Sequence, residues 1–402
     1  MKYCVLILDG SAGWPLADRG NKTTLELART PHLDALAREG TLGLTNNVPA
    51  RMEPSSAVAC MSLLGYDPVV YYRGRAAIEA VSMGVPIQRG EAVFRCNLVA
   101  VKAGRMWSYC AGHIENEEAR ELIEALNEKL GSEYVRFYPG VGYRHLLKIK
   151  GHMETTKAVC TPPHDIPEKP VADFLPKGRG SRLLNKVMAD SQEVLKHHPV
   201  NYHRVARGQV PATTAWLFWG SGAIPKMPSF DDAYGLKASI TSGVDLLRGL
   251  GQMMGMTILD IKGVTDDMKN NFSGQAEGAL LSLRDNDLTV IHVEAPDEAG
   301  HAGNADEKIK AIQVTDTEVV GRLREYARDN PLRILVMPDH PTPVAVRTHV
   351  AEPVPFLLWG AGFESDSASR FTEAEAGGTG LLIPRGHDLM ARFTGGGKNA
   401  KA

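Results

Sequence analysis

Carboxylate and imidazole side chains gather just after three apolar segments of the sequence. The segments are YCVLIL (3–8), DLTVIHVE (287–294) and LRILVM (332–337). The polar residues that follow them are Asp9, Asp297, His301, Asp339, His340 and His349. Carboxylate oxygens mixed with imidazole nitrogens suit Mn²⁺, Zn²⁺ or Mg²⁺. The sequence therefore predicts a metal centre, provided that the three segments are neighbouring strands.

Each of these residues taken alone has a simpler explanation. An Asp after a strand is often a helix cap, and an Asp-His pair in a loop often forms a local hydrogen-bonded turn. Asp297 and His301, however, are four residues apart, so on a helix they would face the same way. In open α/β sheets, ligands bind beyond the carboxyl ends of the strands. We therefore expect all six side chains at that one edge of a sheet.

Ser56 is the candidate nucleophile. It ends the segment EPSS (53–56), directly before the apolar stretch AVACMSLL (57–64). The simpler interpretation is a helix N-cap. A helix N-terminus also offers free N–H groups and partial positive charge, which favour a phosphate. A serine bound to a divalent cation there could ionise near neutral pH and attack phosphorus, so the sequence predicts metal-dependent phosphoryl transfer.

Strands alternate with helices at both ends of the chain, which is typical of a doubly wound α/β core with a mostly parallel sheet. The middle of the chain indicates an inserted smaller α+β domain. We expect a metal-binding core at 1–90 and 206–394, an inserted substrate-binding or lid domain at 91–205, and a disordered tail at 395–402.

Composition limits the class of protein. The chain has 402 residues, 43% of them hydrophobic and 23% charged, with a net charge of −2. This charge favours neither nucleic acid nor an anionic membrane as a partner, and no apolar run has the length of a membrane span. The five cysteines form no CxxC pair, and the first apolar run is too short for a signal peptide. We expect a cytoplasmic enzyme with a small phosphorylated substrate, and leave its oligomeric state open.

Longer motifs carry a family resemblance. They are LILDG (6–10), KTTLELARTPHLDALAREG (22–40), SLLGYDP (62–68), YYRGRAAIEA (71–80), FRCNLVA (94–100), YGLKASIT (234–241), HVEAPDEAGH (292–301) and PDHPTPVAVRTHVAEPVPF (338–356). In this order, and over nearly the whole chain, the set resembles the archaeal-type 2,3-bisphosphoglycerate-independent phosphoglycerate mutases. That family is a branch of the alkaline phosphatase superfamily of metalloenzymes.

The resemblance implies a two-metal site and a phosphoserine intermediate at Ser56. One divalent cation would take Asp9, Ser56, Asp339 and His340, and the other would take Asp297, His301 and His349. Mn²⁺ is the first choice for both, with Zn²⁺ or Mg²⁺ as alternatives. The resemblance also gives Lys237 a catalytic role, neutralising the phosphate, although a solvated lysine at a strand end is the simpler explanation.

The inserted domain and its hinges should hold the rest of the substrate. The candidate residues are Arg73, Arg75, Arg95, Asn97, Arg144, His145, His164, Asp165 and Arg204. Arginine binds carboxylate and phosphate in bidentate fashion. A surface or hinge salt bridge is the simpler role for any one of them.

Two departures from the family pattern keep other functions open. The family usually reads Pro-Gly-Ser-Asp at the nucleophile, where this chain has Pro54-Ser55-Ser56-Ala57, and Trp219 stands where the mutases would have an arginine. The segments AVSMGVP (80–86) and WGSG (219–222) are closer to a bacterial clade of proposed homoserine kinases, although no GxxxxGK[ST] loop is present. We expect a phosphoglycerate mutase. The alternatives are a phosphotransferase of the homoserine kinase type, a metal-dependent phosphatase and a metal-binding scaffold without activity.

Overall fold

The computed structural model describes residues 1–366 and 368–395. The predicted disordered tail therefore lies outside the described residues, except for Gly395. The chain divides into two compact units. The first consists of residues 1–72 and the segment that begins at Lys226, and the second consists of residues 73–225.

An eight-stranded sheet forms the centre of the first unit, in the order β13-β2-β12-β11-β1-β10-β8-β9. Its strands are β1 (Lys2–Leu8), β2 (Thr41–Thr45), β8 (Ala238–Thr241), β9 (Thr257–Ile258), β10 (Leu288–Val293), β11 (Leu332–Met337), β12 (Val354–Trp359) and β13 (Leu382–Ile383). All paired strands are parallel except β12, which is antiparallel to both of its neighbours. The predicted α/β fold with a mostly parallel sheet is confirmed.

The central strands are buried on both faces, which explains their continuous apolar sequences. In β1, Cys4 to Leu8 are fully buried. β1 lies between β10 and β11, with Ile7 level with both His292 and Met337. The three strands that precede the predicted metal ligands are therefore direct neighbours and point the same way.

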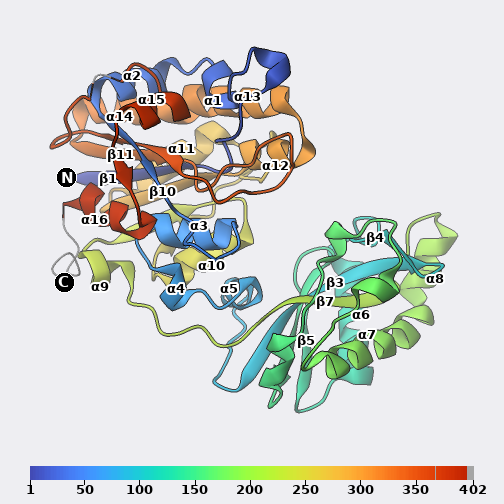
Figure 1. Cartoon of the computed structure of the whole chain (residues 1–402). Coiled ribbons are helices and arrows are strands. Elements are labelled where there is room, and N and C mark those ends of the chain that lie inside the picture. Colours follow the sequence, from blue (N-terminus) through green and yellow to red (C-terminus); the bar gives the residue numbers. More distant parts are fainter. Residues whose placement is uncertain (367, 396–402) are drawn as a thin grey trace. The chain divides into compact units, whose positions relative to one another are not determined.

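Helices cover both faces of this sheet (Figure 1). α2, α11, α13 and α14 lie on one side, and α3, α10 and α16 lie on the other. The helices of the unit are α1 (Thr24–Leu27), α2 (Pro31–Glu39), α3 (Ser56–Leu63), α4 (Pro68–Tyr71), α9 (Phe230–Tyr234), α10 (Asp245–Met253), α11 (Phe272–Ser282), α12 (Ala295–Ala302), α13 (Ala305–Thr315), α14 (Gly321–Asp329), α15 (Glu373–Gly378) and α16 (Leu389–Thr394).

One predicted helix, 306–328, contains a π-helical turn at Asp316–Val320. The turn places the Asp316 carboxylate at the N-terminus of α2. There it accepts hydrogen bonds from the backbone N–H groups of Leu33 (2.7 Å) and His32 (3.2 Å). Thr30, the N-cap residue of α2, makes no side-chain cap itself, so Asp316 satisfies these donors instead.

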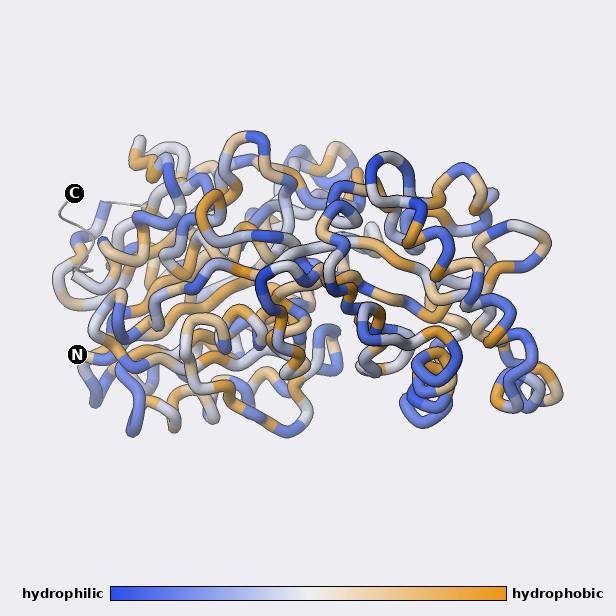
Figure 2. The backbone as a smooth tube through the Cα atoms, turned by 90° about the horizontal axis from the view of Figure 1, so that it is seen from below, coloured by the Kyte–Doolittle hydropathy of each residue, from blue (hydrophilic) through white to orange (hydrophobic). Residues whose placement is uncertain are grey.

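The second unit is built on a five-stranded antiparallel sheet, in which β3 pairs with β4, β6 and β7, and β6 pairs with β5. Its strands are β3 (Glu91–Lys102), β4 (Arg105–Ser108), β5 (Val135–Tyr138), β6 (Arg144–Lys150) and β7 (Thr214–Ser221). Its helices are α5 (Arg75–Ser82), α6 (Asn116–Leu130), α7 (Ser181–Lys196) and α8 (Pro199–Ala206). Figure 2 shows hydrophobic stretches of the backbone running through the inside of both units.

The structure draws the unit boundaries at 72/73 and 225/226, not at the predicted 90/91 and 205/206. The reason is the packing around β3. β7 pairs with β3 along its length, with Trp216 opposite Asn97. α5 packs on both strands. These two elements therefore join the second unit, although the sequence had assigned them to the core.

Among the described residues, no helix combines the length and apolarity that crossing a membrane requires. The five cysteines are free thiols, and all except Cys160 are buried.

Candidate metal and phosphoryl-transfer site

The predicted metal ligands converge at the carboxyl edge of the first unit's sheet. Asp9 follows β1 and Asp339 follows β11, its neighbour. The two ends are joined directly, because the backbone N–H of Gly10 donates to Asp339 Oδ1 at 3.1 Å. Asp297 and His301 lie on α12, which begins directly after β10. Parallel strand direction thus brings together residues from opposite ends of the chain.

Ser56 lies beside the first predicted set of ligands. Its Oγ is 3.3 Å from Nε2 of His340. The same nitrogen is 3.1 Å from Asp339 Oδ2 and 3.9 Å from Asp9 Oδ1. Asp9, Asp339 and His340 are fully buried, whereas Ser56 is half-buried. The hydroxyl therefore lies at the outer side of a buried group of cation-binding atoms.

The helix cap at this position is Ser55, not Ser56. Ser55 accepts the cap hydrogen bond from Val58 N–H with its Oγ at 3.4 Å, and Ser56 is the first residue of α3. The Ser56 hydroxyl is thus available to face His340. The two serines have different roles that the sequence alone left open.

The second predicted set of ligands is equally close. His301 Nε2 is 3.1 Å from Asp297 Oδ2, and His349 Nε2 is 3.5 Å from Asp297 Oδ1. The two imidazole nitrogens are 2.8 Å apart. On its other side, His349 Nδ1 lies 3.3 Å from the carbonyl oxygen of Pro54. Side chains of three predicted ligands thus converge. Asp297 and His301 face the same way on α12, as their spacing of four residues predicted.

Thr342 connects the two sets and orients His340. Its hydroxyl donates a short hydrogen bond to Asp297 Oδ1, so its oxygen accepts from His340 Nδ1–H, which is 3.3 Å away. Burial lowers the pKa of His340 to about 4, although Asp339 opposes this change. The neutral ring then directs its Nε2 lone pair at the oxygens of Asp339 and Asp9. This arrangement is unfavourable unless a positive charge compensates for it.

Four carboxyl groups share this edge: the buried ones of Asp9, Asp297 and Asp339, and the partly buried one of Glu294. Burial and the nearby Asp339 and Asp297 raise the pKa of Asp9 well above its usual range, and burial and Asp9 do the same for Glu294. Burial would also raise the pKa of Asp297, but hydrogen bonds from the two neighbouring histidines outweigh it and lower the value well below the usual range. The site as a whole has an excess of negative charge.

The donor atoms fit divalent cations. Two groups of side-chain atoms each lie within 4.8 Å of one another: Asp9, Asp339 and His340, and Asp297, His340 and His349. Asp9 Oδ1 is buried and has no hydrogen-bond partner among the described residues, so it could bind a cation. Hard oxygens mixed with imidazole nitrogens suit Mn²⁺, Zn²⁺ or Mg²⁺.

Lys237 lies at the wrong edge of the sheet for its predicted role. It precedes β8, and its carbonyl oxygen accepts from Asp287 N–H at the amino end of β10. Its side chain is exposed. The predicted metal ligands lie beyond the opposite, carboxyl edge of the sheet, roughly 16 Å away along β8. The interpretation of Lys237 as a phosphate-neutralising residue is therefore corrected.

In the second unit, part of the predicted substrate-binding set forms a cationic cluster. Arg95 is buried and donates to both Glu79 and Asn97. Arg75 donates to the same carboxylate at 2.9 Å, and Arg144 lies opposite Asn97 in the neighbouring strand. Burial would raise the pKa of Glu79, but the guanidinium groups of Arg95 and Arg75 lower it. Two guanidinium groups pair with the one carboxylate, and the charge of Arg144 acts on Arg95 as well, which leaves the cluster positively charged.

The other predicted residues of this unit lie outside the cluster. Arg204 is buried by a structural contact, donating to Glu118 and to the carbonyl oxygens of Val210 and Ala111. His145 is buried on the opposite face of β6 and accepts from Gly140 N–H at 3.0 Å.

The remaining three are at the surface. Arg73 precedes α5 and is exposed. His164 and Asp165 are exposed in a 3-10 helix (Pro163–Asp165), where the ring of His164 contacts Trp219. His164 thus borders the cationic cluster through Trp219, whose ring lies 4.6 Å from the guanidinium of Arg75.

Sequence comparison identifies the family. A sequence model described as 2,3-bisphosphoglycerate-independent phosphoglycerate mutase matches residues 37–201. The protein of that name from Methanosarcina barkeri is 44% identical over 393 residues, which cover 97% of this chain and 98% of the relative. The chain belongs to the 2,3-bisphosphoglycerate-independent phosphoglycerate mutase family.

Solved structures of similar proteins agree with the membership of this mutase family. The PH0037 protein from Pyrococcus horikoshii has a TM-score of 0.82 at 26% identity, covering 98% of this chain and 97% of the other. A cofactor-independent phosphoglycerate mutase from Thermoplasma acidophilum has a TM-score of 0.64 at 25% identity, covering 98% and 100%. The family fold therefore extends over both units of this chain.

Sequence reasoning missed several polar residues around the mutase-family site. Thr342 and His292 are buried beside the predicted ligands, and Lys308 is buried with its ammonium group donating to the carbonyl oxygens of Ala12 (2.9 Å) and Thr342 (2.8 Å). One signal was present in the sequence. His292 interrupts an otherwise apolar strand that is buried on both faces, where a polar side chain needs a specific partner.

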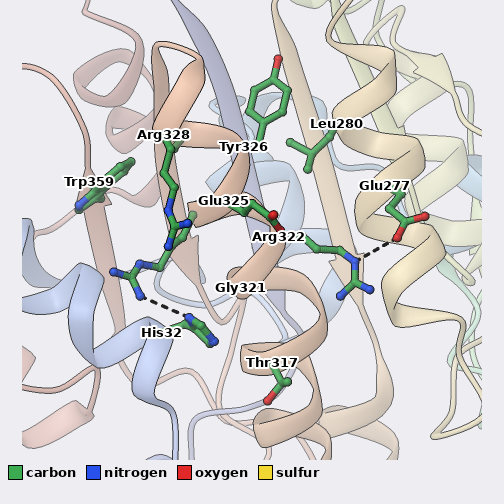
Figure 3. Close-up of a pocket in the computed structure, with 12 residues that line it drawn as sticks. His32, Glu277, Leu280, Thr317, Gly321, Arg322, Glu325, Tyr326, Arg328 and Trp359 are labelled. Atoms are coloured by element: carbon green, nitrogen blue, oxygen red, sulfur yellow. Dashed lines mark hydrogen bonds and ion pairs between the residues drawn. The ribbon is translucent and has the colours of Figure 1, made fainter.

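A recess of about 960 Å³ lies elsewhere in the first unit (Figure 3). It is lined by residues of α2, α11 and α14, among them His32, Glu277 and Arg322. Within it, Arg322 pairs with Glu277 at 3.1 Å, and Arg324 lies 3.3 Å from Nδ1 of His32. None of the predicted site residues lines this recess, so it is separate from the metal centre.

Proposed function

We propose that this chain is a cofactor-independent phosphoglycerate mutase, which interconverts 2-phosphoglycerate and 3-phosphoglycerate through a phosphoserine at Ser56. One observation carries the proposal: the Ser56 hydroxyl lies 3.3 Å from His340, within a buried group of carboxylates and imidazoles that fits divalent cations. Membership of the mutase family supports the choice of reaction.

Two divalent cations would be held at this site. Asp9, Ser56, Asp339 and His340 would hold one, and Asp297, His301 and His349 the other. Such cations lower the pKa of a bound hydroxyl and neutralise the charge of a phosphoryl group in transfer. We propose Mn²⁺ for both positions, because mixed carboxylate and imidazole ligands suit it, with Zn²⁺ or Mg²⁺ as alternatives.

The proposed reaction has two matching halves. In the first, Ser56 Oγ loses its proton and bonds to phosphorus while the bond from phosphorus to one glycerate oxygen breaks, and that oxygen takes up a proton. In the second, the other glycerate hydroxyl loses its proton and attacks phosphorus, and Ser56 Oγ leaves phosphorus and regains a proton. No outside phosphate donor is consumed, so the chemistry needs only that water is kept from the phosphoserine.

The cationic cluster of the second unit supports an anionic substrate. Arg75, Arg95 and Arg144 outnumber the single carboxylate of Glu79, so the cluster keeps positive charge that an anionic group of the substrate would offset. Asn97 adds an amide to the same face of β3. We propose that this cluster binds the carboxylate or phosphate of the substrate, in the bidentate manner typical of arginine.

A phosphotransferase of the homoserine kinase type is the competing proposal. Two observations favour it. Ala57 is 1% exposed and carries no acidic group beside the nucleophile. Trp219, in place of an arginine, lies over the Arg75 guanidinium. Both features reduce the polar contacts available to a glycerate, so the acceptor needs a direct test.

The test follows phosphorus by ³¹P NMR in separate samples of the purified chain with Mn²⁺. One sample holds 3-phosphoglycerate without 2,3-bisphosphoglycerate, and another holds ATP with homoserine. We expect 2-phosphoglycerate to form in the first sample and no phosphohomoserine in the second. Phosphohomoserine would overturn the mutase in favour of the kinase, and release of inorganic phosphate alone would favour a phosphatase.

Two neighbouring serines provide matched variants for this assay. Ser56→Ala is expected to abolish interconversion, because it removes the atom that bonds to phosphorus. Ser55→Ala removes only the helix cap, at a cost of about 1 kcal/mol of stability. It should therefore keep its activity. The reverse pattern would make Ser55 the nucleophile.

We further propose that the enzyme is cytoplasmic, because five free thiols without a disulfide among the described residues are typical of a reducing compartment.

A further inference from the structure

A buried histidine that the reaction does not use lies behind the carboxylate of Asp9. His292, on β10, is 1% exposed. Its Nε2 is 2.7 Å from Asp9 Oδ2 and 3.3 Å from Glu294 Oε2. Its Nδ1 is 2.9 Å from Oγ of Ser242, which follows β8. Three adjacent parallel strands, β1, β10 and β8, thus contribute one residue each to a continuous hydrogen-bonded chain.

The direction of the hydrogen bonds in this chain follows from its chemistry. As a cation ligand, Asp9 is a carboxylate and can only accept, so Nε2 of His292 must carry a hydrogen. In the neutral ring, Nδ1 then accepts, and the Ser242 hydroxyl donates to it. The Ser242 oxygen is held in turn by the backbone N–H of Val244, at 3.0 Å. Every polar atom of the ring therefore has a partner that fixes its tautomer.

This series of hydrogen bonds leaves the two carboxylate oxygens of Asp9 with different surroundings. Oδ2 is held by His292, whereas Oδ1 is buried, has no hydrogen-bond partner and lies 3.9 Å from His340 Nε2. The carboxylate is thus fixed with its free oxygen toward the atoms beside Ser56. We infer that His292, oriented by Ser242, is a positioning residue that aims Asp9 at the cation shared with Ser56, Asp339 and His340. The inference rests on the proposed function.

The second set of predicted ligands, around Asp297, does not depend on the hydrogen bonds of His292. Asp297 is held by Thr342, His301 and His349 instead. Loss of His292 should therefore weaken one cation position and spare the other. Partners in the second layer of a metal site typically contribute 10–100-fold in metal affinity.

A rival role for His292 is direct ligation. Its ring, the Cys60 thiol and Asp9 offer atoms within 4.8 Å of one another. We favour positioning because both candidate atoms already have carboxylate partners. His292 Nε2 is held by Asp9, and Cys60 Sγ donates to Asp339 Oδ2 at 3.6 Å. The number of bound ions distinguishes the two roles.

The experiment measures Mn²⁺ binding to chelator-stripped protein, by the electron paramagnetic resonance signal of free Mn²⁺. The parent is expected to bind two ions per chain. His292→Ala should keep one site at the parent's affinity and weaken the other by about 10–100-fold. His292→Gln, whose amide can donate to Asp9, should recover part of the loss. Ser242→Ala should weaken the same site by about tenfold or less, because only the orienting partner is removed.

Two controls exclude a general effect of losing a buried histidine. His145→Ala removes a buried ring from the second unit and should leave Mn²⁺ binding unchanged. Melting of the stripped proteins shows whether each variant folds. If His292→Ala does not fold, the Ser242→Ala result decides the inference.

Each outcome has a separate meaning. If His292→Ala keeps both sites at the parent's affinity, the positioning role is overturned and the proposed function stands. If His292→Ala does not fold, the same result in Ser242→Ala has the same meaning. Three ions in the parent and two in His292→Ala make His292 a ligand, which also overturns it. A parent that binds no Mn²⁺, Zn²⁺ or Mg²⁺ overturns the metal centre itself, and with it the proposed function.

Discussion

Removing the charge of Glu79 is expected to destabilise the second unit strongly. Among the described residues, Glu79 is the one carboxylate that forms an ion pair with Arg95, and the two side chains are only 9% and 8% exposed. In Glu79→Gln the guanidinium of Arg95 stays buried without a counter-charge. Breaking a buried pair in this way costs about 3–5 kcal/mol. We expect roughly 3 kcal/mol, the lower end of that range, because the glutamine carbonyl still accepts one hydrogen bond.

Glu118→Gln is the matched control for this prediction. Glu118 also pairs with a buried arginine, Arg204, but that guanidinium donates to two carbonyl oxygens as well, at 2.9 and 2.8 Å. It keeps those partners when Glu118 loses its charge. We therefore expect a smaller loss, about 1–2 kcal/mol.

The effect of Glu79 should depend on pH. Its pKa in the folded protein lies below the ordinary value, because Arg95 and Arg75 outweigh the opposing effect of burial. The stability that its charge contributes is therefore complete above the unfolded pKa of about 4.3, and is lost as the pH falls through the folded value. The difference between parent and Glu79→Gln should be largest at pH 7 and should shrink in acid.

Urea unfolding followed by circular dichroism, at pH 7 and at about pH 3.5, measures these differences. Amide exchange of peptides from β3 and β7 assigns them to the second unit. The reasoning is refuted if Glu79→Gln is as stable as the parent at pH 7. It is also refuted if Glu118→Gln loses more stability than Glu79→Gln.

Three further predictions concern the first unit. Gly10→Ala should weaken Mn²⁺ binding at least tenfold, because a Cβ there would meet Asp297 Oδ1 at 2.3 Å. The control Gly20→Ala has the same left-handed backbone but open space around it, so it should cost only about 1 kcal/mol of stability. Equal Mn²⁺ binding by both variants would argue against a crowded site. Lys237→Ala should keep kcat and KM within about twofold, and a large loss of kcat would restore its catalytic role. Removing the cations with a chelator should lower the melting temperature of the parent, because the buried carboxyl groups of Asp9, Asp297 and Asp339 then lose their counter-charges, and an unchanged melting curve would speak against the metal centre.

The convergence of the candidate metal ligands was predictable because strand direction carries the information. Asp9, Asp297 and Asp339 each follow a mostly apolar, buried strand, and in a parallel sheet all such ends meet at one edge. The same rule explains the error with Lys237. It stands before its strand, so it belongs to the amino edge, and the family resemblance had outweighed this simple geometric argument.

The second unit was harder to predict because its contacts are distant in sequence. β7 pairs with β3 across more than 100 residues, and nothing in either strand's sequence specifies that partner. Arg95 and Arg204 illustrate the same difficulty at the level of side chains. Both are buried arginines, but Arg204 is matched by an acid and two carbonyl oxygens, whereas Arg95 belongs to a cluster with excess positive charge. Only the folded arrangement distinguishes a structural arginine from a candidate anion-binding one.

The central claim is that Ser56 carries the phosphoryl group, and the most direct measurement looks for it there. The parent is mixed with 3-phosphoglycerate and Mn²⁺, quenched in acid during turnover, and digested for peptide mass spectrometry. The account predicts one phosphate on Ser56, none on Ser55, and neither phosphopeptide nor interconversion in Ser56→Ala. Interconversion by Ser56→Ala at the parent's rate would contradict the account.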